Sequence, residues 1–306
     1  MHNLRAALLM VLAMAAFACE DALLKGLSGR IPTGQLLAVI GFAGMAVFGL
    51  WIAFSPEGLR LRNLLRPQVA LRNLCEGVCA ITFVTALATG DLSIASAILQ
   101  AQPLLMTLGA ALFLGEQVGW RRWMSIAVGF AGVLILLAPS LQVSGLGVLF
   151  ALLGTAAFAA MVILGRSLRE TPDRDLVLFQ LAAATLAGLV LAPFDWQPVR
   201  SLSDLGLLFL LGVVATAAHM LVTRSLKLAD ASVVAPLQYS LLVWGALLGF
   251  VVFGDVPATG MIAGAALIVG SGLIVLRRSS RDDKSATTEA TAPSPGKGLA
   301  VEDPAA

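Results

Sequence analysis

Residues 93–116 read SIASAILQAQPLLMTLGAALFLGE, and residues 232–255 follow the same plan as SVVAPLQYSLLVWGALLGFVVFGD. Each stretch begins with small and polar residues, carries glutamine and proline in the middle of an apolar run, and ends on glycine followed by an acid. Those ends are Gly115-Glu116 and Gly254-Asp255. The correspondence indicates that the chain consists of two halves built on one plan.

The beginnings of the two halves also correspond. Residues 15–18 and residues 156–159 both read AAFA, and a basic residue follows each at the same distance, Lys25 and then Arg166. Arg5 followed by an apolar run also resembles a cleavable signal peptide, which is the alternative for this segment. Removal of the run would leave its counterpart in the second half without a partner. We therefore expect a retained helix.

The composition places the chain in a lipid bilayer. It has 58% hydrophobic residues, only 12% charged residues and a mean hydropathy of +0.91. A soluble domain of this composition could not cover its surface with polar groups. A helix crosses the hydrocarbon core with about 20 residues, so the apolar part of the chain accommodates ten helices with short loops. The predicted fold is an all-α integral membrane protein.

The expected domains follow from this spacing. The first five-helix repeat is expected within residues 1–138, the second within residues 146–276, and a disordered cytoplasmic tail over residues 277–306, which are too polar to pack. The ten predicted spans are Leu4–Leu24, Gly34–Phe54, Val69–Thr89, Ser93–Leu114, Trp123–Ala138, Leu146–Gly165, Leu176–Phe194, Leu205–Val222, Ser232–Phe253 and Pro257–Leu276.

The basic residues predict the orientation, because cytoplasmic loops retain lysine and arginine. With the N-terminus inside, all of the 20 lysines and arginines except Lys25, Arg30 and Arg200 fall on the cytoplasmic side. Both termini are therefore expected in the cytoplasm. Since each half has an odd number of spans, the two repeats must be inverted relative to each other, an arrangement that recurs in secondary transporters and also in channels.

The repeated ends resemble those of a known family. The segment Phe113-Leu114-Gly115-Glu116, followed by GFAGV at residues 129–133, and its counterpart Phe253-Gly254-Asp255 are similar to motifs of EamA-type members of the drug/metabolite transporter superfamily. The resemblance covers residues 4–276 and implies a ten-helix transporter without specifying its substrate. Two departures stand out: Phe17 and Phe158 where the family commonly has tryptophan, and Asp255 in place of glutamate.

Ionisable side chains are costly inside a bilayer, so the few within the spans are candidates for a substrate or proton pathway. Glu76 is the first candidate, with Arg72 one turn before it as a structural alternative partner. Glu20 is expected to face the cavity, whereas Asp21 can pair with Lys25. His219 could relay protons or donate to a substrate, although a histidine among small residues is often bound to a neighbouring carbonyl.

The middle of each repeated stretch supplies further candidates. Gln100 and Gln102 are expected to face Gln238 and Tyr239 beside the two prolines, where a disturbed helix exposes backbone carbonyls. Amides there could bind a neutral or zwitterionic solute, and Tyr239 and Trp244 could stack on a planar one. The alternative is that these residues hold helices four and nine together.

Taken together, the sequence predicts a secondary transporter of the inner membrane that moves a small organic metabolite by alternating access. The resemblance implies an amino-acid-like solute, a vitamin such as riboflavin, or a nucleoside-like compound. A channel-like or structural membrane protein is the alternative.

No nucleophile–base pair, metal-ligand cluster, cofactor motif or nucleic-acid partner is expected, and Cys19, Cys75 and Cys79 are interpreted as small apolar residues. The GMIAG segment at residues 260–264 is compatible with internal packing or dimerisation, hence a monomer or homodimer.

Overall fold

The computed structural model describes residues 2–28, 30–54, 60–89, 98–137, 145–192, 196–199 and 201–254, with a few single residues between 262 and 270. Helices are the regular structure of these ranges, and no strand occurs within them. Most of the predicted tenth span lies outside the described residues. So do Asp255, both glycines of the GMIAG segment and the predicted tail.

Each predicted span up to the ninth has a helical counterpart. The first half contains α1 (His2–Ser28), α2 (Thr33–Ala53), η1 (Leu61–Leu65), α3 (Pro67–Thr89), α5 (Gln102–Phe113) and α6 (Trp120–Leu137). The second half contains α7 (Gly145–Ser167), α8 (Asp173–Leu191), α9 (Leu202–Leu228), α10 (Ala231–Val234), η4 (Ala235–Tyr239) and α11 (Ser240–Phe253).

Among the described residues, six helices are long and apolar enough to cross a membrane. They are Asn3–Leu27, Gly34–Ala53, Gly145–Ser167, Asp173–Leu191, Leu202–Leu228 and Ala231–Phe253. Large apolar side chains face outward from the bundle: Leu12, Phe42 and Leu186 are each more than half exposed. Such a surface requires lipid rather than water. The prediction of an all-helical membrane protein is confirmed.

The two repeated stretches are interrupted in their middles, as their prolines predicted. In the first stretch a turn at Gln100–Ala101 precedes α5, and Pro103 lies in its first turn, where a missing N–H does no harm. In the second stretch, η4 interrupts the helix around Pro236. Both stretches end on a left-handed glycine, Gly115 at φ 66° and Gly254 at φ 72°, a conformation that terminates helices.

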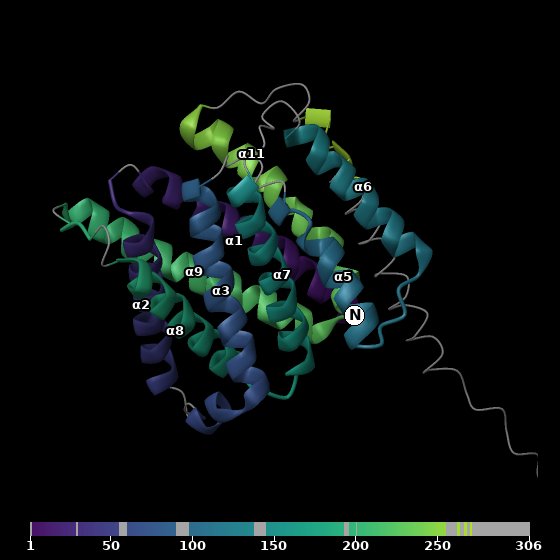
Figure 1. The fold of residues 1–306 in the computed structure, drawn as a ribbon, viewed down its shortest axis with the longest axis horizontal. Coiled ribbons are helices and arrows are strands. Elements are labelled where there is room, and N and C mark those ends of the chain that lie inside the picture. The colour runs from purple at the N-terminus through teal and green to yellow at the C-terminus, as the bar shows by residue number, and fades with distance from the viewer. Residues whose placement is uncertain are drawn as a thin grey trace, which may run out of the picture.

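Helices of the first half pack along helices of the second half. The longest pairings are α3 with α7, α1 with α9 and α2 with α8. Figure 1 shows α2 and α8 together at one side of the bundle and α6 at the opposite edge. Small residues let these backbones approach closely: a Cβ on Gly188 of α8 would lie 2.9 Å from the Cβ of Ala38 in α2.

Candidate functional site

The crossing of α1, α3, α8 and α9 brings polar side chains together inside the apolar bundle. Gln180 of α8 lies at their centre. Its side-chain Oε1 accepts a hydrogen bond from Arg72 Nη2 at 2.6 Å. Its Nε2 lies 3.3 Å from Glu76 Oε2 and 2.8 Å from His219 Nδ1. The four residues come from three helices and form one connected polar cluster.

The chemistry of Arg72 fixes the orientation of the Gln180 amide. A guanidinium has only donors, so it must meet the amide oxygen, and the amide NH₂ is then turned toward Glu76 and His219. His219 Nδ1 accordingly accepts a hydrogen bond, which leaves the proton of the neutral imidazole on Nε2. His219 therefore keeps an N–H donor that Gln180 does not use.

Arg72 was the alternative structural partner of Glu76, and the structure links the two through Gln180. Arg72 is 3% exposed and its Nη1 donates to the Leu176 carbonyl oxygen at 3.3 Å. Its charge is close enough to Glu76 to interact with it, but the hydrogen bonds of its Nη1 and Nη2 go to α8. Arg72 thus joins α3 to α8 and leaves Glu76 beside His219.

Glu20 approaches the same cluster from α1. The ring of Phe17 meets His219 edge-on, with 5.1 Å between ring centroids and 82° between planes. Glu20 lies three residues after Phe17 and therefore on the same face of α1. Its Oε2 is buried without a hydrogen-bond partner within the described part of the chain. The structure thus groups Glu20, Glu76 and His219, all three of which the sequence singled out.

The remaining predicted site residues lie along the contact of α5 with η4 and α11. Gln238 Nε2 is 3.7 Å from Met106 Sδ of α5, and Tyr239 is fully buried against Ile126 of α6. Trp244 packs against the apolar cluster around Met106, while Gln100 and Gln102 are half-buried. Gln238 and Tyr239 thus contact α5 and α6, and Trp244 contacts the apolar cluster; within the described residues this second group is not joined to Gln180.

Sequence reasoning did not select Gln180, although a signal for it was present. It is a lone polar residue in the run VLFQLAAA at residues 177–184, and it is 1% exposed. A glutamine in such a run must find partners inside the protein, because the bilayer offers none.

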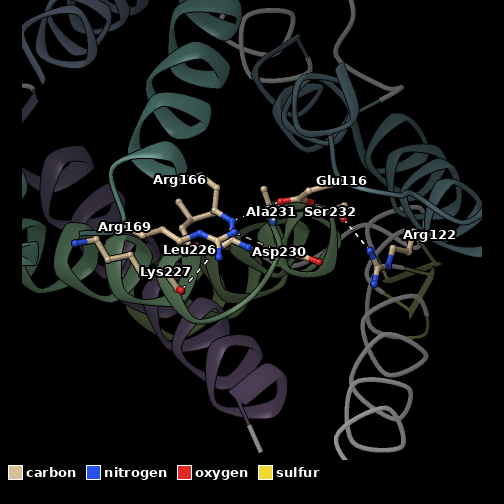
Figure 2. A network of polar contacts seen from close by, with 9 residues as sticks. All are labelled: Glu116, Arg122, Arg166, Arg169, Leu226, Lys227, Asp230, Ala231 and Ser232. Carbon is tan, nitrogen blue, oxygen red and sulfur yellow. Dashed lines mark hydrogen bonds and ion pairs between the residues drawn. The ribbon is translucent and has the colours of Figure 1, made fainter. Parts of the chain in front are cut away.

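A second polar network lies at the end of the bundle that is predicted to be cytoplasmic (Figure 2). Glu116, just after α5, accepts hydrogen bonds from the backbone N–H groups of Ala231 and Ser232 at 3.0 and 3.1 Å, and from the Ser232 hydroxyl at 2.9 Å. Arg166, at the end of α7, lies 3.5 Å from Glu116 Oε1 and 2.6 Å from Asp230 Oδ1.

These contacts keep the Glu116 carboxylate charged. Burial alone would raise its pKa, but the hydrogen bonds from Ser232 and Ala231 and the charge of Arg166 outweigh burial, so the pKa lies below its usual range. Because the pKa is lowered, the interaction is fully present above the ordinary pKa of a glutamate and is lost only as the pH falls through the lowered value.

An apolar helical bundle with a polar cluster buried at its helix crossings defines a multi-pass membrane protein with an internal site, the class that includes transporters and channels. Within the described ranges, no group of three or more His, Cys, Asp or Glu side chains is arranged to hold a metal ion. The chain belongs to the EamA-like transporter family, which matches residues 4–138 and 145–277.

Several curated proteins are similar over most of their length. The riboflavin transporter of Rhizobium johnstonii is 31% identical over 287 residues, covering 91% of this chain and 93% of the relative. The pseudopaline exporter of Pseudomonas aeruginosa is 28% identical, covering 86% and 92%. The S-adenosylmethionine uptake transporter of Rickettsia bellii is 24% identical, covering 87% and 91%.

One solved crystal structure has the same fold, with a TM-score of 0.79 at 22% identity, covering 90% of this chain and 98% of that chain. The family match and the relatives confirm the resemblance to EamA-type members of the drug/metabolite transporter superfamily. They also confirm that the protein is a transporter of small metabolites rather than an enzyme.

Proposed function

We propose that the protein is a secondary carrier of the inner membrane that moves its solute by alternating access, with Glu20, Glu76 and His219 at the solute site. The observation that carries this proposal is the cluster around Gln180, to which α1 and α3 of the first half and α8 and α9 of the second half all contribute. A site shared between two halves changes shape when the halves move relative to each other.

The helix pairing supports an inverted-repeat architecture of ten helices. If the two halves correspond helix by helix, α1 matches α7, α2 matches α8 and α3 matches α9. Exchanging the halves then converts the α1–α9 pair into the α7–α3 pair and returns the α2–α8 pair to itself. This is the behaviour expected of two halves related by a twofold axis. We place that axis in the membrane plane and both termini in the cytoplasm, because each half is predicted to have an odd number of spans and the basic residues favour that orientation.

The side chains favour a solute that carries a positive charge or several hydrogen-bond donors. Two carboxylates, Glu20 and Glu76, flank the cluster, and Oε2 of Glu20 has no hydrogen-bond partner within the described part of the chain. Relatives named for riboflavin, pseudopaline and S-adenosylmethionine make a vitamin, an amino-acid-like compound and a nucleoside-like compound the candidates. The aromatic ring of Phe17, which meets His219 edge-on, is suited to a planar part of such a solute.

Proton coupling is part of the proposal, because Glu20, Glu76 and His219 can each bind a proton and lie within one cluster. A proton entering the site would compete with a cationic solute for the same carboxylates. Such competition is the simplest way to exchange one for the other across the membrane.

Glu76→Gln tests the site. The substitution removes the charge but keeps the shape and an oxygen that can accept from Gln180, so the protein should express normally and lose most of its transport. A thermal-shift screen of metabolites on the purified protein would identify the solute, and counterflow in proteoliposomes would measure its transport. Glu170→Gln, at an exposed position after α7, is the matched control.

Unaltered counterflow by Glu76→Gln would contradict the assignment of this residue. Flux that does not saturate and shows no counterflow would favour the alternative of a channel-like protein.

A further inference from the structure

Glu116 connects the two halves of the protein at one end of the bundle. It belongs to the first half, whereas Arg166, Ala231 and Ser232, to which it is bonded, belong to the second. Other hydrogen bonds also cross between the halves: Arg122 Nη1 of α6 donates to Ser232 Oγ at 2.9 Å, and Arg66 Nη1 donates to Thr171 Oγ1 at 3.2 Å. Figure 2 shows that Ser232 lies between Glu116 and Arg122.

An apolar cluster fills the bundle at this same end. It contains Met10 of α1, Met106 of α5, Met161 of α7 and Val222 of α9, all at most 7% exposed, and Val234 of α10, which is fully buried. Glu20 of α1 and His219 of α9 lie further from this end along two of these helices, and Glu76 lies on α3. Along α1 and α9, these packed side chains lie between the polar site and the end at which Glu116 lies.

The contact of Glu116 with the second half can break without leaving Arg166 unpaired. Gly115 adopts a left-handed conformation, and the Glu116 N–H bonds back to the Ala110 carbonyl at 3.2 Å, so the carboxylate is held at the tip of α5. Arg166 has a second carboxylate partner, Asp230, and also donates to the Leu226 carbonyl at 2.7 Å. These partners belong to its own half, so Arg166 stays paired when Glu116 leaves.

We infer that Glu116 is a gating residue, whose carboxylate holds the tip of α5 to the α9–α10 turn and keeps the predicted cytoplasmic end closed. Opening that end requires release of Glu116 from Ala231, Ser232 and Arg166. The inference rests on the proposed alternating access, and it adds a residue that does not touch the solute.

The contacts of Glu116 favour the closed state because they are charged and largely dry. Its side chain is 6% exposed and that of Arg166 is 2% exposed, so water screens the pair little. A glutamine at this position would lose the charge. Its NH₂ group cannot accept a hydrogen bond, so one of the two backbone N–H groups, which now donate to different oxygens, would lose its acceptor. Losing the charge-assisted bond should lower the equilibrium ratio of closed to open protein by about tenfold.

A cysteine beneath the network provides the test. Ala110→Cys places a thiol at a fully buried position near the tip of α5, in a chain whose Cys19, Cys75 and Cys79 are replaced by alanine. The purified protein in lipid nanodiscs is exposed to a hydrophilic maleimide, and the rate of labelling is measured. Glu116→Gln should increase that rate by about tenfold. Glu170→Gln, which removes an exposed carboxylate nearby, should leave it unchanged.

Ser232→Ala provides a second test for the case that Glu116→Gln does not fold, which the absence of a cooperative unfolding transition would reveal. Ser232→Ala removes the side-chain bonds to Glu116 and Arg122 but keeps the backbone N–H, so labelling should increase by a smaller factor. Unchanged labelling in the folded variants would overturn the gate, even if the unaltered protein transports a metabolite. Increased labelling together with absence of transport by the unaltered protein would support the gate and contradict the proposed function.

Discussion

At the scale of single residues, Gln180 explains how this protein keeps an arginine and a carboxylate inside the bilayer. A directly bonded buried pair would satisfy both charges and leave little for a solute. The amide instead binds the guanidinium with its oxygen and presents its NH₂ group to Glu76 and His219. Arg72 is thereby fixed to α8, and the carboxylate and imidazole remain beside each other.

Gln180→Ala should destabilise the protein by more than the loss of side-chain volume alone would suggest. Without the amide, Arg72 Nη2 loses its 2.6 Å bond in a buried position, at a cost of about 1–3 kcal/mol. Thermal unfolding of the purified protein in detergent measures the effect. Gln117→Ala is the control, because Gln117 is exposed in the loop after α5 and should change little. Equal stability of the two variants would contradict the assigned role of Gln180.

The residues of the polar cluster were only partly predictable. Glu20, Glu76 and His219 could be selected because ionisable groups are rare in the spans, and rarity is visible in one sequence. Gln180 is neutral and did not stand out among apolar neighbours. Its partners Arg72 and Glu76 lie 108 and 104 residues away, so the contacts depend on how α3 packs against α8. No spacing along the chain encodes that packing.

At the scale of helices, hydropathy located the spans but underestimated how far some helices extend. The eighth span was expected to end at Val222, whereas α9 continues to Leu228. Its last turns carry Arg224 and Lys227, which lie 3.2 and 2.5 Å from carboxylate oxygens of Asp173 in α8. A charged segment ends the apolar pattern but not the helix, because ion pairs and backbone bonds stabilise it beyond the bilayer.

The α2–α8 contact depends on a glycine on the facing side of α2. A Cβ on Gly41 would lie 2.8 Å from both the Leu181 carbonyl oxygen and the Thr185 nitrogen, which are backbone atoms that cannot move aside cheaply. Gly41→Ala should therefore destabilise the protein by about 1–3 kcal/mol. Gly49→Ala on the same helix meets no atom within 4 Å and should be neutral or slightly stabilising. Thermal unfolding of both variants in detergent checks the difference, and a neutral Gly41→Ala would exclude the close contact.

At the scale of the whole molecule, the two halves are not independent units. The repeated motifs predicted two similar five-helix segments, and the longest helix contacts of the structure run between the halves. Buried polar bonds also cross, from Arg72 to Gln180 in the interior and from Ser232 to Glu116 at one end. The proposed movement of the halves relative to each other would have to break the bonds of Glu116 at that end while the helix contacts of the interior hold the halves together.

A chain divided between the halves should accordingly assemble only from both parts. Residues 1–141 and residues 142–306, produced together as separate polypeptides, should copurify through an affinity tag on either one. Each part produced alone should be degraded, because α1, α2 and α3 would expose to lipid the faces that normally contact α9, α8 and α7, including buried Arg72. Copurification in membranes, followed by thermal unfolding of the complex, measures the assembly. Glu116→Gln in the first part should leave copurification intact, since the interior pairings remain. Stable accumulation of either half alone would show that the pairing between halves is not what holds the bundle together.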